Sequence, residues 1–257
     1  MPKYVVVNRS QHSLTTWKPP ENYKFAARSN LVALLIPDVA AAVAEMPIGL
    51  IRSNNNFELV ALLSFNSDEN AFVGPDGKWL MRYIPATLRG YPFMMARQPG
   101  SDQGVLCVDE ESECFGNGEE RFFELDGSPS AAVQRAIAFQ TAIEAAQRQT
   151  AAAVKALEEA SLLVPWDIKF KSGQNVRGLS GLYRIDGRAM ERLDDQIVVK
   201  LHKLSALAIA YGQIVSMHQL STVERLSEIQ DRLRQRASGA SSEQLAALLK
   251  MDDGLIF

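Results

Sequence analysis

The chain has 257 residues, 47% of them hydrophobic and 22% charged, which is typical of a folded globular protein rather than a disordered or fibrous one. Its formal charge of −3, with lysines and arginines dispersed along the chain, argues against nucleic acid as a partner. The longest apolar stretch in the C-terminal half, residues 206–211, is far below the roughly 18 residues that a membrane span requires. With no recognisable signal peptide and only two cysteines, we expect a cytoplasmic protein with reduced thiols and no membrane span.

The first 125 residues combine short β-rich runs with turn signals, which predicts a β-rich half. Asn30 can cap a helix that runs toward Glu45, with a kink or break at Pro37. The turn residues Pro75-Asp76-Gly77 predict a hairpin between Phe72 and Trp79. Strands are predicted at residues 4–7, 57–65, 93–95 and 105–108.

Residues 126–236 are predicted to be mainly helical. The run Asp126-Gly127-Ser128-Pro129 supplies a capping serine and a proline for the first turn of an alanine-rich helix that ends near Ala160. Residues 162–170 suit a strand or extended segment interrupted by Pro165, followed by a loop and a strand that closes at Asp186-Gly187. A further helical region from about residue 190 to 236 is expected to break near Gly212.

These elements predict one α+β domain over residues 1–236, in which an antiparallel N-terminal sheet packs against long C-terminal helices. Residues 237–257 are predicted to be a flexible linker and a short amphipathic tail, for which Ser241 and Gln244 could form a capping box. The tail can dock on its own body or in a groove of a protein partner. Its residues available for burial there include Leu245, Leu248, Leu249, Ile256 and Phe257.

A lone arginine, Arg89, lies in the stretch YIPATLRGYPFMM at residues 83–95. A guanidinium near Tyr83 and Tyr91 can stack on a ring while it binds a carboxylate or phosphate, which predicts a clamp for a small anionic or peptide ligand. Together with Trp79, these side chains form the predicted ligand site. The alternative is that Arg89 pairs with an internal acid such as Asp109 or Asp126 and pins the loop.

Catalytic and metal signatures are weak throughout. Asp109 and Asp186 are the candidates for acid or base chemistry, with turn capping as the alternative for both. The acidic stretch at residues 109–120 departs from a calcium loop, and residues 173–180 lack the lysine of a phosphate loop. The two cysteines and the histidines His12, His202 and His218 show no metal-ligand spacing. We therefore predict no metal and no cofactor.

An ordered series of segments resembles the bacterial SapC-like family. The segments are residues 69–93, 105–112, 121–127 and 178–186, and the resemblance spans residues 32–226. The family pattern commonly has two adjacent arginines before Tyr-Pro-Phe, whereas the second position here is Gly90. The resemblance implies no settled activity and gives no support for the peptide-transport permease that shares the name. Family members are often encoded beside TonB-dependent receptors and flavin-dependent halogenase-like proteins, which implies an accessory role in uptake or modification of a small molecule or peptide.

Three functions remain open on this basis. The leading one is a cytoplasmic, non-catalytic binding or accessory protein with a pocket near Arg89, Tyr91 and Trp79. The second is a small-molecule-modifying enzyme in which Arg89 holds an anionic substrate and Asp109 or Asp186 moves protons. The third is a structural protein-interaction module that uses the tail and the helical face at residues 226–233.

Overall fold

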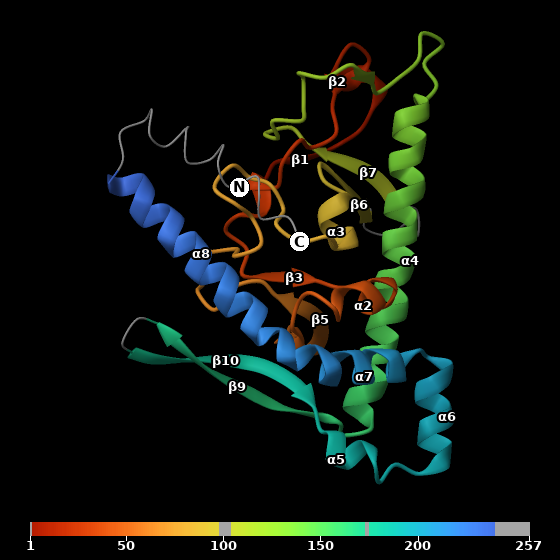
Figure 1. The fold of residues 1–257 in the computed structure, drawn as a ribbon. Helices are drawn as coiled ribbons and strands as arrows, with labels where there is room; N and C mark the ends of the chain where they lie inside the picture. The colour runs from red at the N-terminus through yellow and green to blue at the C-terminus, as the bar shows by residue number, and fades with distance from the viewer. Residues whose placement is uncertain (1, 98–103, 173–174, 240–257) are drawn as a thin grey trace.

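The computed structural model describes residues 2–97, 104–172 and 175–239. Figure 1 shows the order of the elements, and the architecture confirms the predicted α+β class. The elements are β1 (Tyr4–Val6), α1 (Arg9–His12), β2 (Thr16–Trp17), η1 (Lys24–Ala26), β3 (Leu31–Ala33), α2 (Ile36–Ala42), β4 (Ile48–Ser53), β5 (Asn56–Leu62), α3 (Ala86–Arg89), β6 (Phe93–Arg97), β7 (Gly104–Asp109), β8 (Glu120–Arg121), α4 (Ala131–Glu159), β9 (Leu163–Ser172), β10 (Asn175–Ile185), α5 (Gly187–Met190), α6 (Asp195–Lys203), α7 (Ala206–Ser216), η2 (Met217–Gln219) and α8 (Leu220–Gly239).

The largest sheet has five antiparallel strands in the order β3-β5-β4-β10-β9. Strands β4 and β5 form a hairpin that turns at Asn54 and Asn55, whose φ angles of 47° and 64° are in the left-handed region that asparagine tolerates. Strand β9 is continuous through Pro165, which pairs with Tyr183, so the predicted interruption is wrong. Proline is tolerated there because β9 is the edge strand and one side of its backbone needs no partner.

A smaller sheet, ordered β1-β7-β6, and a ribbon of β2 and β8 complete the β-structure of the described residues. The predicted strands at residues 4–7, 57–65, 93–95 and 105–108 are confirmed as β1, β5, β6 and β7, with ends that differ by at most three residues. The predicted turn after Phe72 is also present, with Gly77 at a φ of 87°. Its flanking strands are reduced to one bridge between Val73 and Trp79.

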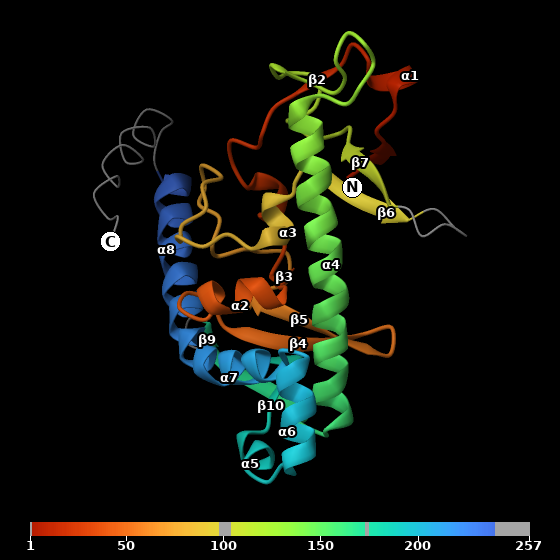
Figure 2. The ribbon, with the colours of Figure 1, turned by 90° about the vertical axis from the view of Figure 1, so that its right-hand side faces the viewer.

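Helix α4 connects the two sheets. It runs along the molecule from the region of β2 to that of α6, with α8 on the opposite side (Figure 2). Its buried residues Ala153 and Leu157 belong to the main core, which the five-stranded sheet forms with α2, α7 and α8. At its other end, Ala132 and Val133 belong to a second core around Trp17, Phe93 and Phe122. One amphipathic helix therefore fixes the position of the small sheet relative to the large one.

Two predicted helix starts are wrong. Residues 31–33 form β3 rather than a helix capped by Asn30, and α2 begins only after Leu35, with Pro37 in its first turn, where a missing N–H is tolerated. Ser130 caps α4, and its hydroxyl accepts a hydrogen bond from the Val133 N–H. Residues 126–128 instead form a turn. The predicted end of α4 near residue 160 is confirmed.

The C-terminal helices break at other places than expected. Helix α7 continues through Gly212, whose missing side chain lets α7 approach α2 closely: a methyl group there would lie 2.5 Å from Val39 Cγ1. The breaks fall at Ser205, which has a φ of 59°, and at η2.

In the described part of the chain, no single helix is long and apolar enough to cross a membrane. Asp195–Lys203 and Ala206–Arg234 taken together satisfy the length and composition criteria, with a bend of 91° between them.

Helix α8 is attached to the loop at residues 70–73 by a buried glutamine. Gln230 Nε2 lies 3.2, 2.8 and 2.7 Å from the carbonyl oxygens of Asn70, Ala71 and Val73. An ion pair of 2.6 Å between Arg234 and Glu69 follows one turn later. On the helical face at residues 226–233, Leu226 is buried and Ile229 is exposed.

Candidate ligand-binding site

Arg89 ends the short helix α3 and is exposed. Its Nε donates to the Ile84 carbonyl at 3.0 Å, and its guanidinium carbon lies 5.5 Å from the centroid of the Phe139 ring. The predicted ring contact is therefore made by a residue of α4 rather than by Tyr91. Among the described residues no carboxylate lies within 4.0 Å of this guanidinium, so neither Asp109 nor Asp126 pairs with it.

Tyr83 and Trp79 serve as packing and anchoring groups beside Arg89. The Tyr83 hydroxyl donates to Oδ1 of the buried Asp38, and Trp79 Nε1 donates to the Tyr83 carbonyl at 2.7 Å. Burial, followed by the hydrogen bond to Asp38, raises the pKa of Tyr83, while the nearby Arg89 guanidinium acts in the opposite direction. Both aromatic rings also pack on the main core. Arg89 therefore stands next to a tyrosine whose hydroxyl is already bound to an internal carboxylate.

Tyr91 makes contacts that differ from those of Tyr83. Its ring stacks on Phe25 with the centroids 3.9 Å apart and the planes 12° from parallel. Its hydroxyl donates to Asp109 Oδ2 at 3.0 Å. Burial, together with the Asp109 carboxylate and despite an opposing hydrogen bond from Ser112, raises the pKa of Tyr91 to about 12. Tyr91 is consequently a fixed neutral phenol near neutral pH.

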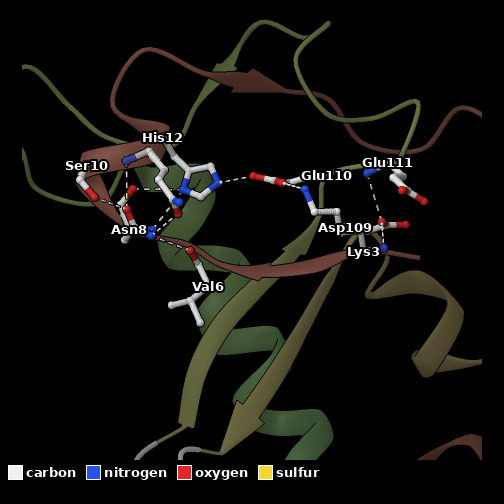
Figure 3. A network of polar contacts seen from close by, with 9 residues as sticks. Lys3, Val6, Asn8, Ser10, His12, Asp109, Glu110 and Glu111 are labelled. Atoms are coloured by element: carbon white, nitrogen blue, oxygen red, sulfur yellow. Dashed lines mark hydrogen bonds and ion pairs between the residues drawn. The ribbon is translucent and has the colours of Figure 1, made fainter. Parts of the chain in front are cut away.

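Asp109 holds the N-terminal strand and Tyr91 together. Its side chain is 3% exposed, and Oδ1 accepts hydrogen bonds from the backbone N–H of Lys3 at 2.8 Å and of Glu111 at 3.2 Å. The neighbouring Glu110 pairs with Lys3 Nζ at 3.0 Å and lies 3.6 Å from Nε2 of the buried His12 (Figure 3). With three donors on one carboxylate, Asp109 acts as a structural acceptor of the strand and turn.

The described residues form a hollow of about 330 Å³ beside Tyr91. One wall is the Phe25–Tyr91 stack, another is the turn that carries Ser112 and Cys114, and the third is the loop before η1. This volume is at the lower end of the range that small-molecule sites occupy. Tyr91 is the member of the predicted ligand set that lines it. Arg89, Trp79 and Tyr83 lie outside its lining, so the structure divides the predicted site in two.

The rim of this hollow carries both signs of charge. Its lysines are Lys18 and Lys24, and its glutamates are Glu21, Glu111 and Glu113. Lys18 is paired with Glu21 at 2.7 Å, whereas the other three charged groups make no ion pair among the described residues. Such a rim suits a ligand with both an amine and a carboxylate better than a simple anion.

The hollow also contains a thiol and a hydroxyl. Cys114 is 5% exposed, and burial raises the pKa of its thiol, which keeps it protonated and weakly nucleophilic near neutral pH. The Ser112 hydroxyl accepts the Cys114 N–H at 3.0 Å, as in a turn cap. None of the three histidines, His12, His202 and His218, lines this hollow, so its lining offers no imidazole base. This chemistry can recognise polar groups through hydrogen bonds.

Asp186, the other candidate acid, caps α5. Its Oδ1 accepts the backbone N–H of Arg188 at 3.0 Å and of Ala189 at 3.3 Å, which corresponds to the turn-capping alternative.

Within the described ranges, no group of three or more His, Cys, Asp or Glu side chains is arranged to hold a metal ion. The tail residues predicted to bind a partner, Leu245, Leu248, Leu249, Ile256 and Phe257, lie outside the described residues.

Sequence reasoning missed two residues that shape this region. Asp38 is 1% exposed and accepts hydrogen bonds from the Leu35 and Ala86 N–H groups at 2.8 and 3.2 Å, besides the Tyr83 hydroxyl. The signal for Asp38 was available, since a carboxylate at the third position of a helix and next to proline is typical of a first turn. Phe25 carried no such signal, because its stacking partner is 66 positions away and no local pattern connects the two.

Comparison with known proteins gives one match. The family model described as SapC matches residues 7–223 of this chain. No curated protein matches the sequence, and no solved structure matches it either. The matched range includes both parts of the divided site and the residues that line the hollow.

Proposed function

Because the chain belongs to the SapC family, and because residues from three distant segments enclose one hollow beside Tyr91, we propose that it is a cytoplasmic, non-catalytic accessory protein that binds a small ligand there. The ligand class that fits is a small molecule or peptide end with an amine and a carboxylate. The proposed role is assistance in the uptake or modification of that ligand, in keeping with the accessory role that the family resemblance implies.

The observation that carries this proposal is the way Tyr91 is fixed. Phe25 holds its ring, and Asp109 holds its hydroxyl. A wall that is already in place loses little conformational freedom when a ligand binds, which favours recognition. Asp109 itself lies behind Tyr91 with three donors and is absent from the lining, so binding is better supported than acid–base catalysis.

The proposal can be tested by native mass spectrometry of protein purified from its own cells, followed by thermal-shift assays with amino acids, dipeptides and simple carboxylates. We expect a retained mass and a raised melting temperature with zwitterionic compounds, because a ligand that binds only the folded state stabilises it. Glu113→Lys, on the rim, is expected to weaken both signals. The matched control is Glu119→Lys, an exposed change nearby that is outside the lining. Equal ligand retention by both variants would contradict the proposed site.

A further inference from the structure

A second, larger hollow of about 910 Å³ opens where the β9–β10 hairpin meets α5 and α7. Figures 1 and 2 place these helices at the end of the molecule away from β2. Met190, Ile214 and Met217 give the hollow an apolar part. Methionine and isoleucine side chains at an open hollow offer surface that is stabilised when another apolar group covers it.

Two exposed side chains of α7 lie at or near this hollow. Tyr211 lines it and is nevertheless 59% exposed, and Val215, one helical turn later on α7, is 54% exposed. A large aromatic side chain beside an apolar hollow is the combination found at the centre of protein interfaces. The protrusion and the hollow lie on the same face of one chain.

The charges around the hollow are balanced in sign. Arg184 and Arg188 supply two cations, and Asp186 and Glu191 supply two anions. Among the described residues, none of the four makes an ion pair within 4.0 Å. A ligand of one charge would gain from one pair and be repelled by the other, so the pattern does not select a simple anion or cation.

We propose that this face binds a second copy of the same chain in a two-fold symmetric dimer. A two-fold contact brings each surface against itself, so the surface must carry both a protrusion and a hollow and charges of both signs. Tyr211 of each copy fills the apolar hollow of the other. Arg188 of each copy faces Glu191 of the other, and this contact pairs two charges that form no ion pair with any described residue of their own copy.

The test is a pair of charge reversals measured by sedimentation velocity over a range of protein concentrations. Arg188→Glu places two acids opposite each other twice in a dimer, and Glu191→Arg does the same with two cations. Each variant alone is therefore expected to dissociate at least roughly tenfold more readily than wild type, since like charges in contact cost several kcal/mol. An equimolar mixture of the two variants restores both opposite-charge contacts and is expected to form a heterodimer as stable as the wild-type dimer.

Two further variants and a set of melting curves show whether the effect comes from this face. Arg192→Glu changes an exposed neighbouring charge that does not line the hollow, and is expected to leave the dimer unchanged. Tyr211→Ala is expected to weaken the dimer without lowering the melting temperature of the monomer. Melting curves of all variants confirm folding. A wild-type chain that remains monomeric at about 100 μM, well above the micromolar range of ordinary interfaces, would overturn the proposal. So would a mixture of the two reversals that fails to associate.

Discussion

Residues 83–89 form what we call the Arg89 corner, and removing the Asp38 carboxylate is the sharpest test of how this segment is held. Asp38→Ala leaves the N–H groups of Leu35 and Ala86 without their acceptor. An unsatisfied buried donor costs about 1–3 kcal/mol, so the two together cost about 2–6 kcal/mol. Removing a buried charge also relieves its desolvation, which offsets part of that loss. We expect unfolding to become easier by about 3 kcal/mol, which for a chain of this size lowers the melting temperature by roughly 6–12 °C.

The assay is urea unfolding followed by tryptophan fluorescence, supported by thermal melts. Asp38→Asn keeps one acceptor oxygen and is expected to lose less stability than Asp38→Ala. The matched control is Asp195→Ala, an exposed acid in the first turn of α6, with an expected change within about 0.5 kcal/mol. If Asp38→Ala is no less stable than this control, the three hydrogen bonds do not hold the corner in the way described.

Three further predictions use other parts of the molecule. Gly212→Ala is expected to lower the free energy of unfolding by about 1–3 kcal/mol, because the new methyl group would overlap α2. The control Gly178→Ala meets no atom within 4 Å, and an equal loss there would contradict the packing argument. Gln230→Ala removes the donor to three loop carbonyls, so hydrogen exchange measured by mass spectrometry is expected to speed up in α8, whereas unchanged exchange would show that the contact is dispensable. Wild type is expected to lose stability as the pH rises from about 10 to about 12, because the folded state keeps the Tyr91 proton that the unfolded chain releases. The Tyr91→Phe variant is expected to lose less stability over the same pH range. Identical pH profiles of the two proteins would refute this expectation.

Much of the fold follows from local patterns, and the errors have specific physical causes. The turn at Gly77 and the long helix α4 are encoded by residues close in sequence, so their positions were predictable. The segment after Asn30 has an apolar spacing that suits a helix, yet residues 31–33 pair with β5 and form an edge strand. Pairing with a distant strand overrode the local preference, which is common for short segments. Strand β4 was missed because its hairpin turn uses two asparagines rather than glycine or proline.

The site was predictable only in part. Tyr91 was singled out as a residue of an aromatic corner, and in the structure it lines a hollow. Its separation from Arg89 was not foreseeable, because the direction of each side chain depends on partners far away in sequence. The hydroxyl of Tyr91 donates a hydrogen bond to Asp109 at the end of β7. Arg89 instead contacts the Ile84 carbonyl and the ring of Phe139 on α4. Adjacent positions in a motif can therefore serve different surfaces.

Gly90 explains how this division is maintained. Where the family pattern commonly has a second arginine, this glycine packs against α4, and a methyl group there would lie 2.5 Å from Gln140 Nε2. The same Gln140 amide donates hydrogen bonds to the carbonyls of Gly90 at 3.0 Å and Phe93 at 2.7 Å, and these bonds hold the backbone on both sides of Tyr91. The guanidinium of Arg89 lies over the ring of Phe139, which is the preceding residue of α4. Two successive residues of one helix thus hold the Arg89 side chain and the backbone on both sides of Tyr91, and the first carbon of any side chain at position 90 would meet the amide of the same glutamine.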